Sequence, residues 1–407
     1  MSDDDPALLV VDDNDDNRYT LTRRLAREGY RDLTTATNGR EALDLLQAKP
    51  FDLVLLDIMM PDMNGYEVLE RMKAGAGLRD IPVIMISALS EVESVIRCIE
   101  LGAEDYLPKP FNPTLLRARV GASLEKKRLR DEVRASLARL QQEMDAARTL
   151  QLGMLPLDFP ACTAEQPVEI HAFMEPAREV GGDLYDFFYA SEHLFCFLVG
   201  DVSGKGAAAA MFMARTRSLV RMATQLWRKT SGDQIAPKRI AEAVNHELCQ
   251  NNRDRMFVTL FLGVLDTKTG VLTYVNAGHL APRVLHASGR IEPLNDKPAM
   301  PLAVRASAAY QERTVTLLPG DAVFVFSDGV TEAMNAADEF YGNQRLQVDL
   351  CAASAMTPEE IVHAIQAKVD LFTGDAPKFD DVTMVALRWQ PAEARTTNER
   401  ILTVFDT

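Results

Sequence analysis

The stretch DLVLLDIMMPDMNG, residues 52–65, decides the fold of the N-terminal part of the chain. It begins with an apolar run that ends at Asp57 and continues into the Pro and Gly residues of a turn. Further short runs of this kind lie at residues 8–12, 81–87 and 105–109. Segments with helical periodicity separate the runs. This alternation predicts βαβ units around a parallel sheet.

The composition restricts the class of protein. The 407 residues are enough for two or three domains of ordinary size. An acidic N-terminus and the absence of a long apolar stretch predict a cytoplasmic protein without a membrane segment. The net charge of −15 argues against a nucleic-acid-binding protein and leaves carboxylates for divalent cations. The five cysteines are widely spaced, which indicates reduced thiols instead of disulfides or a zinc site.

Residues from about 114 to 155 have the pattern of one long helix. Apolar residues recur there at spacings of four and three: Val133, Leu137, Leu140, Met144 and Ala147. This period forms one apolar seam, which either covers part of the same chain or pairs with a second copy. We favour a coiled coil, and therefore a homodimer through this helix. We expect the charged run 125–134 to be a solvated face of the helix and not a nucleic-acid site.

Residues from about 165 to 390 have a different pattern. Strand-like segments lie at 168–174, 184–190, 193–201, 257–266, 271–279, 283–288, 322–328 and 381–389. Helical segments lie at about 206–228, 236–250 and 357–373. Strands in runs with segregated helices predict an α+β sandwich of antiparallel sheets. We expect four parts: a first domain at 1–120, a helical linker at 121–160, a second domain at 161–390 and a polar tail at 391–407.

Five polar residues follow the predicted strands of the first domain. They are Asp12, Asp13, Asp57, Ser87 and Lys109. Each alone would fit a turn or a helix cap, but the carboxyl ends of parallel strands meet at one edge of a sheet. Carboxylates gathered there can hold Mg²⁺. The same group can accept a phosphoryl group: Asp57 attacks, Lys109 balances charge, and Ser87 donates to a phosphoryl oxygen.

The motifs LLVVDDND, LLDIMMPDMNGYEVL, MISA and LGAEDYLPKPF resemble the receiver domain of two-component response regulators, over about residues 7–120. The resemblance implies a flavodoxin-like fold with strand order 2-1-3-4-5. It also implies that a histidine kinase phosphorylates Asp57. A Mg²⁺ ion would be held by Asp13, Asp57 and the backbone carbonyl of Met59, with help from Asp12.

The receiver resemblance also assigns roles to other residues. Ser87 and Tyr106 match the positions that switch conformation in this family. Lys109 and Pro110 match a Lys-Pro pair whose peptide bond is usually cis.

A second set of acids lies beside glycines and apolar strands in the second domain. Its members are Asp183, Asp201, Asp328, Asp380 and Asp381. Each Gly-Asp pair alone would fit a turn, but acids gathered from several strand ends are what a two-metal phosphoryl-transfer site requires. Oxygen ligands suit Mg²⁺ or Mn²⁺. The sequence GDVSGKG, residues 200–206, lacks the pattern of an ATP-binding loop.

These acid motifs, with RTLQLGMLP, NAGHLAP, MPLAV, LLPGD and EFYG, resemble the bacterial PPM serine phosphatases of sigma-factor partner switching, over about residues 150–390. The resemblance implies that Asp183 and Asp201 bridge two metal ions and that the Val202 carbonyl, Asp328 and Asp380 complete the ligands. Asp380 is preferred to Asp381 because the first acid of the pair matches the family's ligand.

Two further motif residues have less definite roles. Arg178 could contact phosphate, or it could be an ordinary surface arginine. His279 is interpreted as structural.

The whole pattern predicts a response regulator whose phosphorylation at Asp57 controls a metal-dependent protein serine/threonine phosphatase. The family implies a phosphorylated anti-anti-sigma-type protein as its substrate. The main alternative is a signalling adaptor that binds a partner without hydrolysis. A DNA-binding regulator would need a basic helix-turn-helix, which we do not find, and a nucleotide phosphodiesterase would usually add histidine ligands to the acids.

Overall fold

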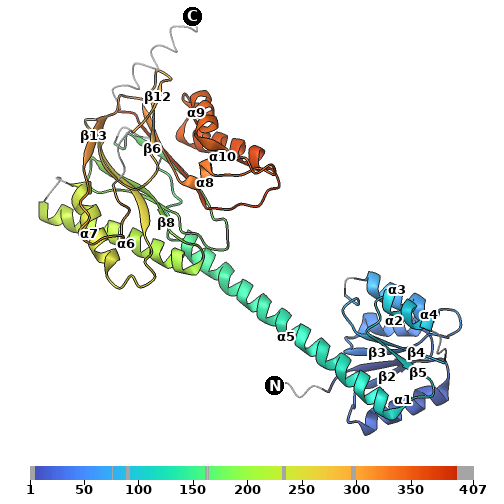
Figure 1. The fold of residues 1–407 in the computed structure, drawn as a ribbon. Helices are drawn as coiled ribbons and strands as arrows, with labels where there is room; N and C mark the ends of the chain where they lie inside the picture. Colours follow the sequence, from blue (N-terminus) through green and yellow to red (C-terminus); the bar gives the residue numbers. More distant parts are fainter. Residues whose placement is uncertain are drawn as a thin grey trace, which may run out of the picture. The chain divides into compact units, whose positions relative to one another are not determined.

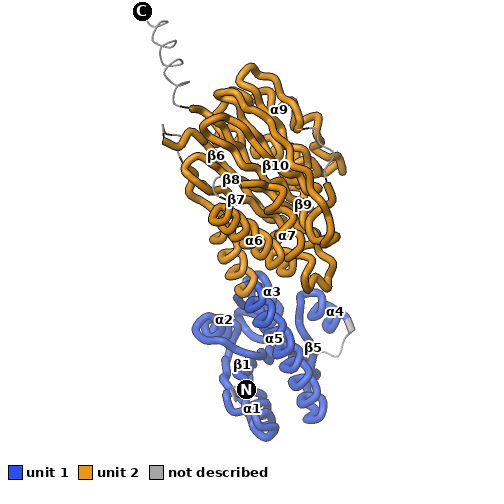
Figure 2. Tube along the Cα trace, turned by 90° about the vertical axis from the view of Figure 1, so that its left-hand side faces the viewer, with its two compact units in different colours: residues 1–141 blue, residues 142–407 orange. Residues whose placement is uncertain are grey.

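The computed structural model describes residues 5–75, 77–88, 92–160, 163, 165–231, 235–294 and 299–391. Cys162 and the predicted polar tail from residue 392 on lie outside these residues. The chain divides into two compact units, residues 1–141 and 142–407 (Figure 2). No helix among the described residues is both long and apolar enough to cross a membrane.

The first unit is a parallel five-stranded sheet with helices on both faces (Figure 1). Its strands are β1 (Leu8–Val11), β2 (Leu33–Ala36), β3 (Leu53–Asp57), β4 (Val83–Ser87) and β5 (Asp105–Pro108). Its helices are α1 (Asp15–Arg27), α2 (Gly39–Ala48), α3 (Gly65–Ala74), α4 (Val92–Glu100) and the first part of α5 (Pro113–Leu152). The strand order β2-β1-β3-β4-β5 confirms the predicted flavodoxin-like topology.

Burial on both faces explains the continuous apolar runs in the central strands of this sheet. All residues of β1, β3 and β4 are buried. One core, which includes Leu9 and Met72, lies on the side of α2, α3 and α4, and the other, which includes Leu8 and Val120, lies on the side of α1 and α5. The edge strand β2 has the sequence LTTA and is only partly buried, so it has no apolar run.

The second unit contains two antiparallel sheets. The first has the order β13-β10-β9-β8-β7 and the second the order β12-β11-β14-β15-β6. The strands are β6 (Val168–Glu175), β7 (Leu184–Tyr189), β8 (Leu194–Val202), β9 (Val258–Asp266), β10 (Val271–Ala277), β11 (Arg283–Leu285), β12 (Ile291–Pro293), β13 (Arg313–Thr316), β14 (Ala322–Phe326) and β15 (Val382–Trp389). The helices are α6 (Ala207–Ser231), α7 (Pro237–Cys249), α8 (Asp328–Thr331), α9 (Gly342–Ala353) and α10 (Pro358–Thr373).

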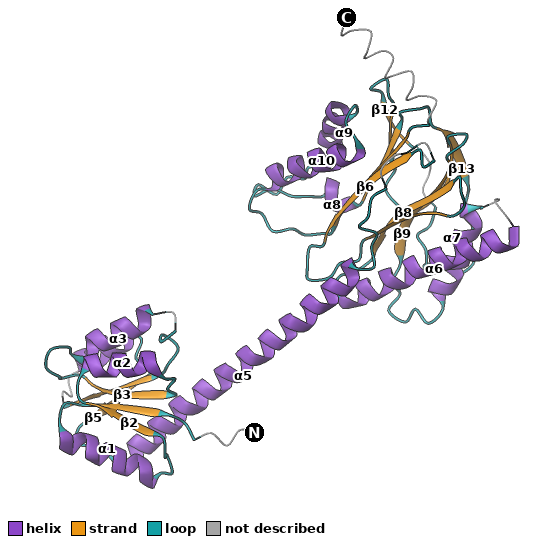
Figure 3. Cartoon of the chain, turned by 180° about the vertical axis from the view of Figure 1, so that it is seen from behind, coloured by secondary structure: helices purple, strands orange, loops and turns teal. Residues whose placement is uncertain are grey.

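The two sheets form the inner layers of a four-layered sandwich (Figure 3). The central core joins side chains from both sheets, among them Phe197 of β8 and Val385 of β15. Helices α6 and α7 cover the outer face of the first sheet, and α9 and α10 cover the outer face of the second. The predicted α+β sandwich with antiparallel sheets is therefore confirmed.

Helix α5 is one continuous element of 40 residues. Every residue from 131 to 146 is exposed, and the exposed fractions of Val133 and Leu137 are 59% and 60%. Four of the five seam residues are therefore exposed in the single chain, whereas Ala147 is half-buried, and pairing of the seam with a second copy stays a prediction.

The charged run in α5 is largely exposed, as expected, but it also forms ion pairs with the first unit. Lys127 contacts Asp52 at 2.9 Å, Lys126 contacts Glu104 at 2.5 Å, and Arg134 contacts Asp80 at 2.9 Å. These ion pairs hold α5 against the rest of the first unit. Sequence periodicity could not reveal them because the acidic partners lie far away in the chain.

Candidate phospho-acceptor and metal sites

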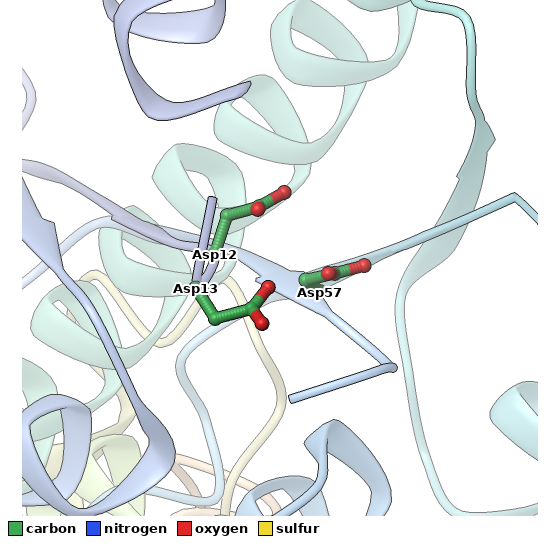
Figure 4. Close-up of side chains that lie close together, drawn as sticks. All are labelled: Asp12, Asp13 and Asp57. Atoms are coloured by element: carbon green, nitrogen blue, oxygen red, sulfur yellow. The ribbon is translucent and has the colours of Figure 1, made fainter. Parts of the chain in front are cut away.

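The first site lies at the carboxyl edge of the parallel sheet. The Lys109 ammonium is 2.9 Å from Asp12 Oδ2 and 2.9 Å from Asp57 Oδ2. The side chains of Asp12, Asp13 and Asp57 converge there, each offering a carboxylate oxygen within 4.8 Å of the others (Figure 4). Asp12 and Asp57 are buried, whereas Asp13 is exposed. Three acids and one lysine therefore lie together at this edge, with one side of the cluster open to solvent at Asp13.

Local hydrogen bonds fix Asp12 at this edge. The Asn14 backbone N–H and the Asn17 side-chain amide both donate to Asp12 Oδ1 at 3.0 Å. Asn14 also caps α1, because its side chain accepts from the backbone N–H groups of Asp16 and Asn17. The turn from β1 into α1 therefore positions the carboxylate before any ligand binds.

The charge of this cluster suits a cation. Burial raises the pKa of Asp57 to about 6, and repulsion from Asp12 and Asp13 adds to the effect while the hydrogen bond from Lys109 opposes it. One lysine does not balance three carboxylates. An oxygen-rich, partly open site with excess negative charge fits a Mg²⁺ ion.

The other predicted receiver residues lie around this cluster. Ser87 ends β4 and is buried, and the Tyr106 hydroxyl donates to the Ser87 carbonyl at 3.5 Å. Met59 lies two residues after Asp57 and is 64% exposed. The Lys109–Pro110 peptide bond is cis.

The second set of acids lies where the two sheets of the sandwich end. Asp183 directly precedes β7 and Asp201 lies near the end of β8, and the antiparallel pair Leu184–Gly200 brings them side by side. Asp328 begins α8 just after β14, and Asp380 lies just before β15. These strands are also paired, because Phe326 lies opposite Met384. Each sheet thus contributes two carboxylates.

The pKa values show that these acids influence one another. Burial, with repulsion from Asp201 and Asp381, raises the pKa of Asp183 well above its usual range. Burial and repulsion from Asp328 and Asp380 raise the pKa of Asp201 to about 7. Acids of the second sheet therefore raise the pKa of an acid of the first sheet.

One atom of this set has no partner. Asp183 Oδ2 is buried and has no hydrogen-bond partner among the described residues. A buried carboxylate oxygen without a donor is costly unless a cation binds it. This atom and the mutual repulsion fit Mg²⁺ or Mn²⁺ held by oxygen ligands.

The two adjacent acids Asp380 and Asp381 have different surroundings. Asp381 accepts hydrogen bonds from the backbone N–H groups of Ala177 at 2.8 Å and Gly182 at 2.6 Å, so its carboxylate braces the loop before Asp183. Asp380 is partly exposed and its Oδ2 lies 3.0 Å from the Lys205 ammonium. This difference supports Asp380 as the ligand, which stays a prediction.

Glycines are needed in the loop that Asp381 braces. A Cβ atom on Gly181 would lie 2.4 Å from Asp381 Oδ2, and one on Gly182 would lie 2.8 Å from the Val202 carbonyl oxygen. Only glycine permits this approach. The Val202 carbonyl, a predicted ligand, is thereby placed beside the backbone that leads to Asp183.

Two residues of this site were not predicted from the sequence. Gln151, in the last turn of α5, exchanges two hydrogen bonds with the Gly181 backbone. Lys205 contacts Asp380 and donates to the Phe379 carbonyl. Both lie in motifs quoted above, but their partners are 30 or more residues away in the chain.

The remaining motif residues make no hydrogen bond or ion pair with the acids among the described residues. Arg178 is exposed, and no contact of its guanidinium is seen among the described residues. His279 is buried, with Nδ1 at 2.9 Å from Thr259 Oγ1, and burial lowers its pKa to about 4. This environment agrees with the structural interpretation of His279.

Comparison with known proteins identifies both parts of the chain. Residues 8–121 match the response regulator receiver domain, and residues 191–390 match the family of stage II sporulation protein E (SpoIIE). The SiaA-PP2C domain of Pseudomonas aeruginosa aligns with a TM-score of 0.55 and 19% identity over 63% of this chain and 99% of that domain. This similarity concerns the fold alone.

Curated relatives match parts of the chain. Protein IcfG of Synechocystis sp. is 31% identical over 285 residues, which cover 63% of this chain and 42% of IcfG. The probable transcriptional regulator ycf27 of Cyanidium caldarium is 42% identical over 119 residues, or 29% of this chain and 46% of that protein. The chain thus spans less than half the length of each of these relatives. It joins an N-terminal region that matches the response regulator receiver domain to a C-terminal region that matches the SpoIIE family and has the fold of the SiaA-PP2C domain.

Proposed function

We propose that this chain is a metal-dependent protein serine/threonine phosphatase that phosphorylation of Asp57 controls. Its substrate would be a phosphoserine or phosphothreonine protein of the anti-anti-sigma type. The observation that carries the proposal is the placement of Asp183, Asp201, Asp328 and Asp380 at the ends of paired strands in the two sheets. Burial and the neighbouring carboxylates raise the pKa values of Asp183, Asp201 and Asp328 there.

The residues of the phosphatase site would have different roles in metal binding, positioning and charge. Two Mg²⁺ or Mn²⁺ ions would be held by Asp183, Asp201, Asp328, Asp380 and the Val202 carbonyl. When bound, the ions would neutralise phosphoryl charge and activate a water molecule. Asp381 keeps the backbone before Asp183 in place, and Lys205 adds a positive charge at the rim of the site. Arg178 remains a candidate contact for phosphate.

The receiver residues would perform the transfer to Asp57. An Asp57 oxygen attacks the phosphorus of a phosphohistidine on the kinase, a P–O bond forms, the P–N bond breaks, and the imidazole takes up a proton. Lys109 already lies 2.9 Å from Asp57 and balances the charge of the product. Ser87 would donate to a phosphoryl oxygen. A Mg²⁺ ion bound by Asp13, Asp57 and the Met59 carbonyl, near Asp12, would stabilise the added charge.

Helix α5 offers a physical connection between the two activities. In its middle part, Lys127 and Arg134 pair with acids of the receiver domain. At its end, Gln151 binds the backbone that leads to Asp183. Phosphorylation would rearrange Ser87 and Tyr106, and a changed pairing of two α5 helices in a homodimer would reach the phosphatase site.

The phosphatase activity is tested by Mn²⁺-dependent release of phosphate from an anti-anti-sigma phosphoprotein, with a cyclic dinucleotide as a control substrate. We expect release from the phosphoprotein only, and its loss in Asp201→Asn. If neither protein releases phosphate but both bind the phosphoprotein, the adaptor function replaces the phosphatase.

The control by Asp57 is tested by measuring phosphate release with and without beryllofluoride, a mimic of the phosphoryl group. We expect the rate to change in the natural protein and to stay constant in Asp57→Asn. Equal rates in the natural protein, with beryllofluoride shown to be bound, would contradict the proposed regulation.

A further inference from the structure

We propose that a cavity of about 310 Å³ beside Asp380 receives an apolar side chain of the substrate protein, close in sequence to its phosphorylated residue. This inference rests on the proposed phosphatase function and names a determinant of its specificity. The occupant would be an unbranched or γ-branched apolar side chain, such as that of Met or Leu.

The cavity is apolar at its walls. Phe173 of β6, Val369 of α10 and Val382 of β15 line it, and both valines are buried. Binding pockets in proteins are usually apolar concavities with a few polar groups that fix the ligand. A volume of this size, with such walls, suits an apolar side chain together with a short part of its backbone.

The cavity adjoins the candidate metal site at Asp380. Asp380 and Lys205 are part of its lining, and so is Gly329, which follows Asp328. A polypeptide whose phosphoryl group lies at the carboxylates would therefore pass the opening of the cavity. This adjacency favours the substrate as the occupant.

Two aromatic rings of the lining are unusually exposed. The exposed fractions of Phe340 and Phe379 are 56% and 55%. Apolar rings at the opening of an apolar cavity gain free energy when a partner covers them. The two rings form an apolar border at the opening of the cavity, and they are not buried when this chain folds.

The charges around the cavity select against an acidic residue. Lys378 is paired with Glu175 and lies 3.8 Å from Asp370, and Lys205 is paired with Asp380. Glu332 also lines the cavity. Acids thus outnumber bases at this opening, and an acidic side chain would be repelled.

The test uses variants that alter the cavity and leave the predicted metal ligands unchanged. Gln366→Trp fills the cavity from α10, and Phe340→Ser removes an exposed ring. Ala367→Trp, on an exposed position of the same helix, is the matched control. The probes are phosphoserine peptides with leucine moved through the neighbouring positions, their serine-substituted counterparts, and p-nitrophenyl phosphate.

We expect the natural protein to prefer one leucine peptide over its serine counterpart by about tenfold in kcat/KM, and also in affinity measured by fluorescence anisotropy. Gln366→Trp and Phe340→Ser should lose this preference but hydrolyse p-nitrophenyl phosphate within about twofold of the natural rate. Ala367→Trp should keep the preference.

The proposal is overturned if the natural protein shows no leucine preference at any position, or if the preference survives in Gln366→Trp. If the natural protein fails to hydrolyse p-nitrophenyl phosphate with Mn²⁺, the proposed phosphatase function fails. The anisotropy measurements still decide the role of the cavity in that case, because they need no hydrolysis.

Discussion

The side chain of Gln151 binds both backbone polar groups of Gly181. Its Nε2 donates to the Gly181 carbonyl at 2.6 Å, and the Gly181 N–H donates to its Oε1 at 3.1 Å. Gln151 is buried, and Gly181 lies two residues before Asp183. The last turn of α5 is therefore attached to the backbone that carries a predicted metal ligand.

Replacing Gln151 by leucine should weaken both folding and catalysis. The substitution keeps an apolar stem but leaves the two Gly181 backbone groups buried without partners, which costs on the order of 1–3 kcal/mol. The loop before Asp183 would also lose a contact that fixes its position. We expect a lower free energy of unfolding in urea and a lower rate of phosphate release in Gln151→Leu.

The matched control for this prediction is Gln142→Leu, because Gln142 lies on the same helix and is exposed. It should change neither quantity. An unaltered rate of phosphate release in Gln151→Leu, with the protein still folded, would show that this attachment does not serve the phosphatase site.

We expect Lys205 to lower the affinity of the predicted phosphatase site for Mn²⁺, so its replacement should raise that affinity. Its ammonium lies 3.0 Å from Asp380, so a cation that approaches Asp380 meets a positive charge and must displace an ion pair. In Lys205→Met we expect Mn²⁺ to bind more tightly, by about three- to tenfold, with both side chains partly exposed and screened by water. Isothermal titration calorimetry measures the affinity. Lys268→Met, in an exposed turn, is the control, and an unchanged affinity in Lys205→Met would refute the competition.

The sequence predicts the sheets well because burial imposes simple patterns on them. Strands β1, β3 and β4 are buried on both faces and are therefore continuous apolar runs. Acids that directly follow such strands are brought to one edge by the topology, which explains why the Asp12–Asp57 cluster could be anticipated. The edge strand β2 and helix α9 bury few residues and carry no comparable signal.

The contacts that complete the sites could not be predicted in this way. Gln151 and Gly181 are 30 residues apart, and Lys205 contacts a residue more than 170 positions away. Neither periodicity nor composition records such a pairing, because it depends on how whole elements pack. For the same reason, the ion pairs that Lys127 and Arg134 form with distant acids could not be predicted from the charged run that contains them.

His279 should make the stability of the second domain depend on pH. Its pKa is lowered to about 4 by burial, whereas the unfolded side chain titrates near 6.5. Below pH 6.5 the unfolded chain therefore binds a proton that the folded protein does not, and the free energy of unfolding falls by about 1.4 kcal/mol per pH unit until pH 4. Urea unfolding between pH 4.5 and about 7.5 measures this dependence.

The prediction concerns the difference in pH dependence between the natural protein and a variant without His279. In His279→Gln the decrease of stability from neutral to acidic pH should be smaller than in the natural protein. The exposed His246→Gln should leave the decrease unchanged. Parallel pH profiles for His279→Gln and the natural protein would show that His279 is not the group responsible.

The apolar seam of α5 should hold two copies of the chain together. Leu137 and Leu140 are 60% and 54% exposed in the single chain, and a coiled coil would bury both in its interface. We expect the natural protein to sediment as a dimer and Leu137→Lys/Leu140→Lys to sediment as a monomer in analytical ultracentrifugation. Gln142→Lys adds a charge on the opposite face of the helix and should remain dimeric. A dimer that survives the double substitution would place the interface elsewhere in the protein.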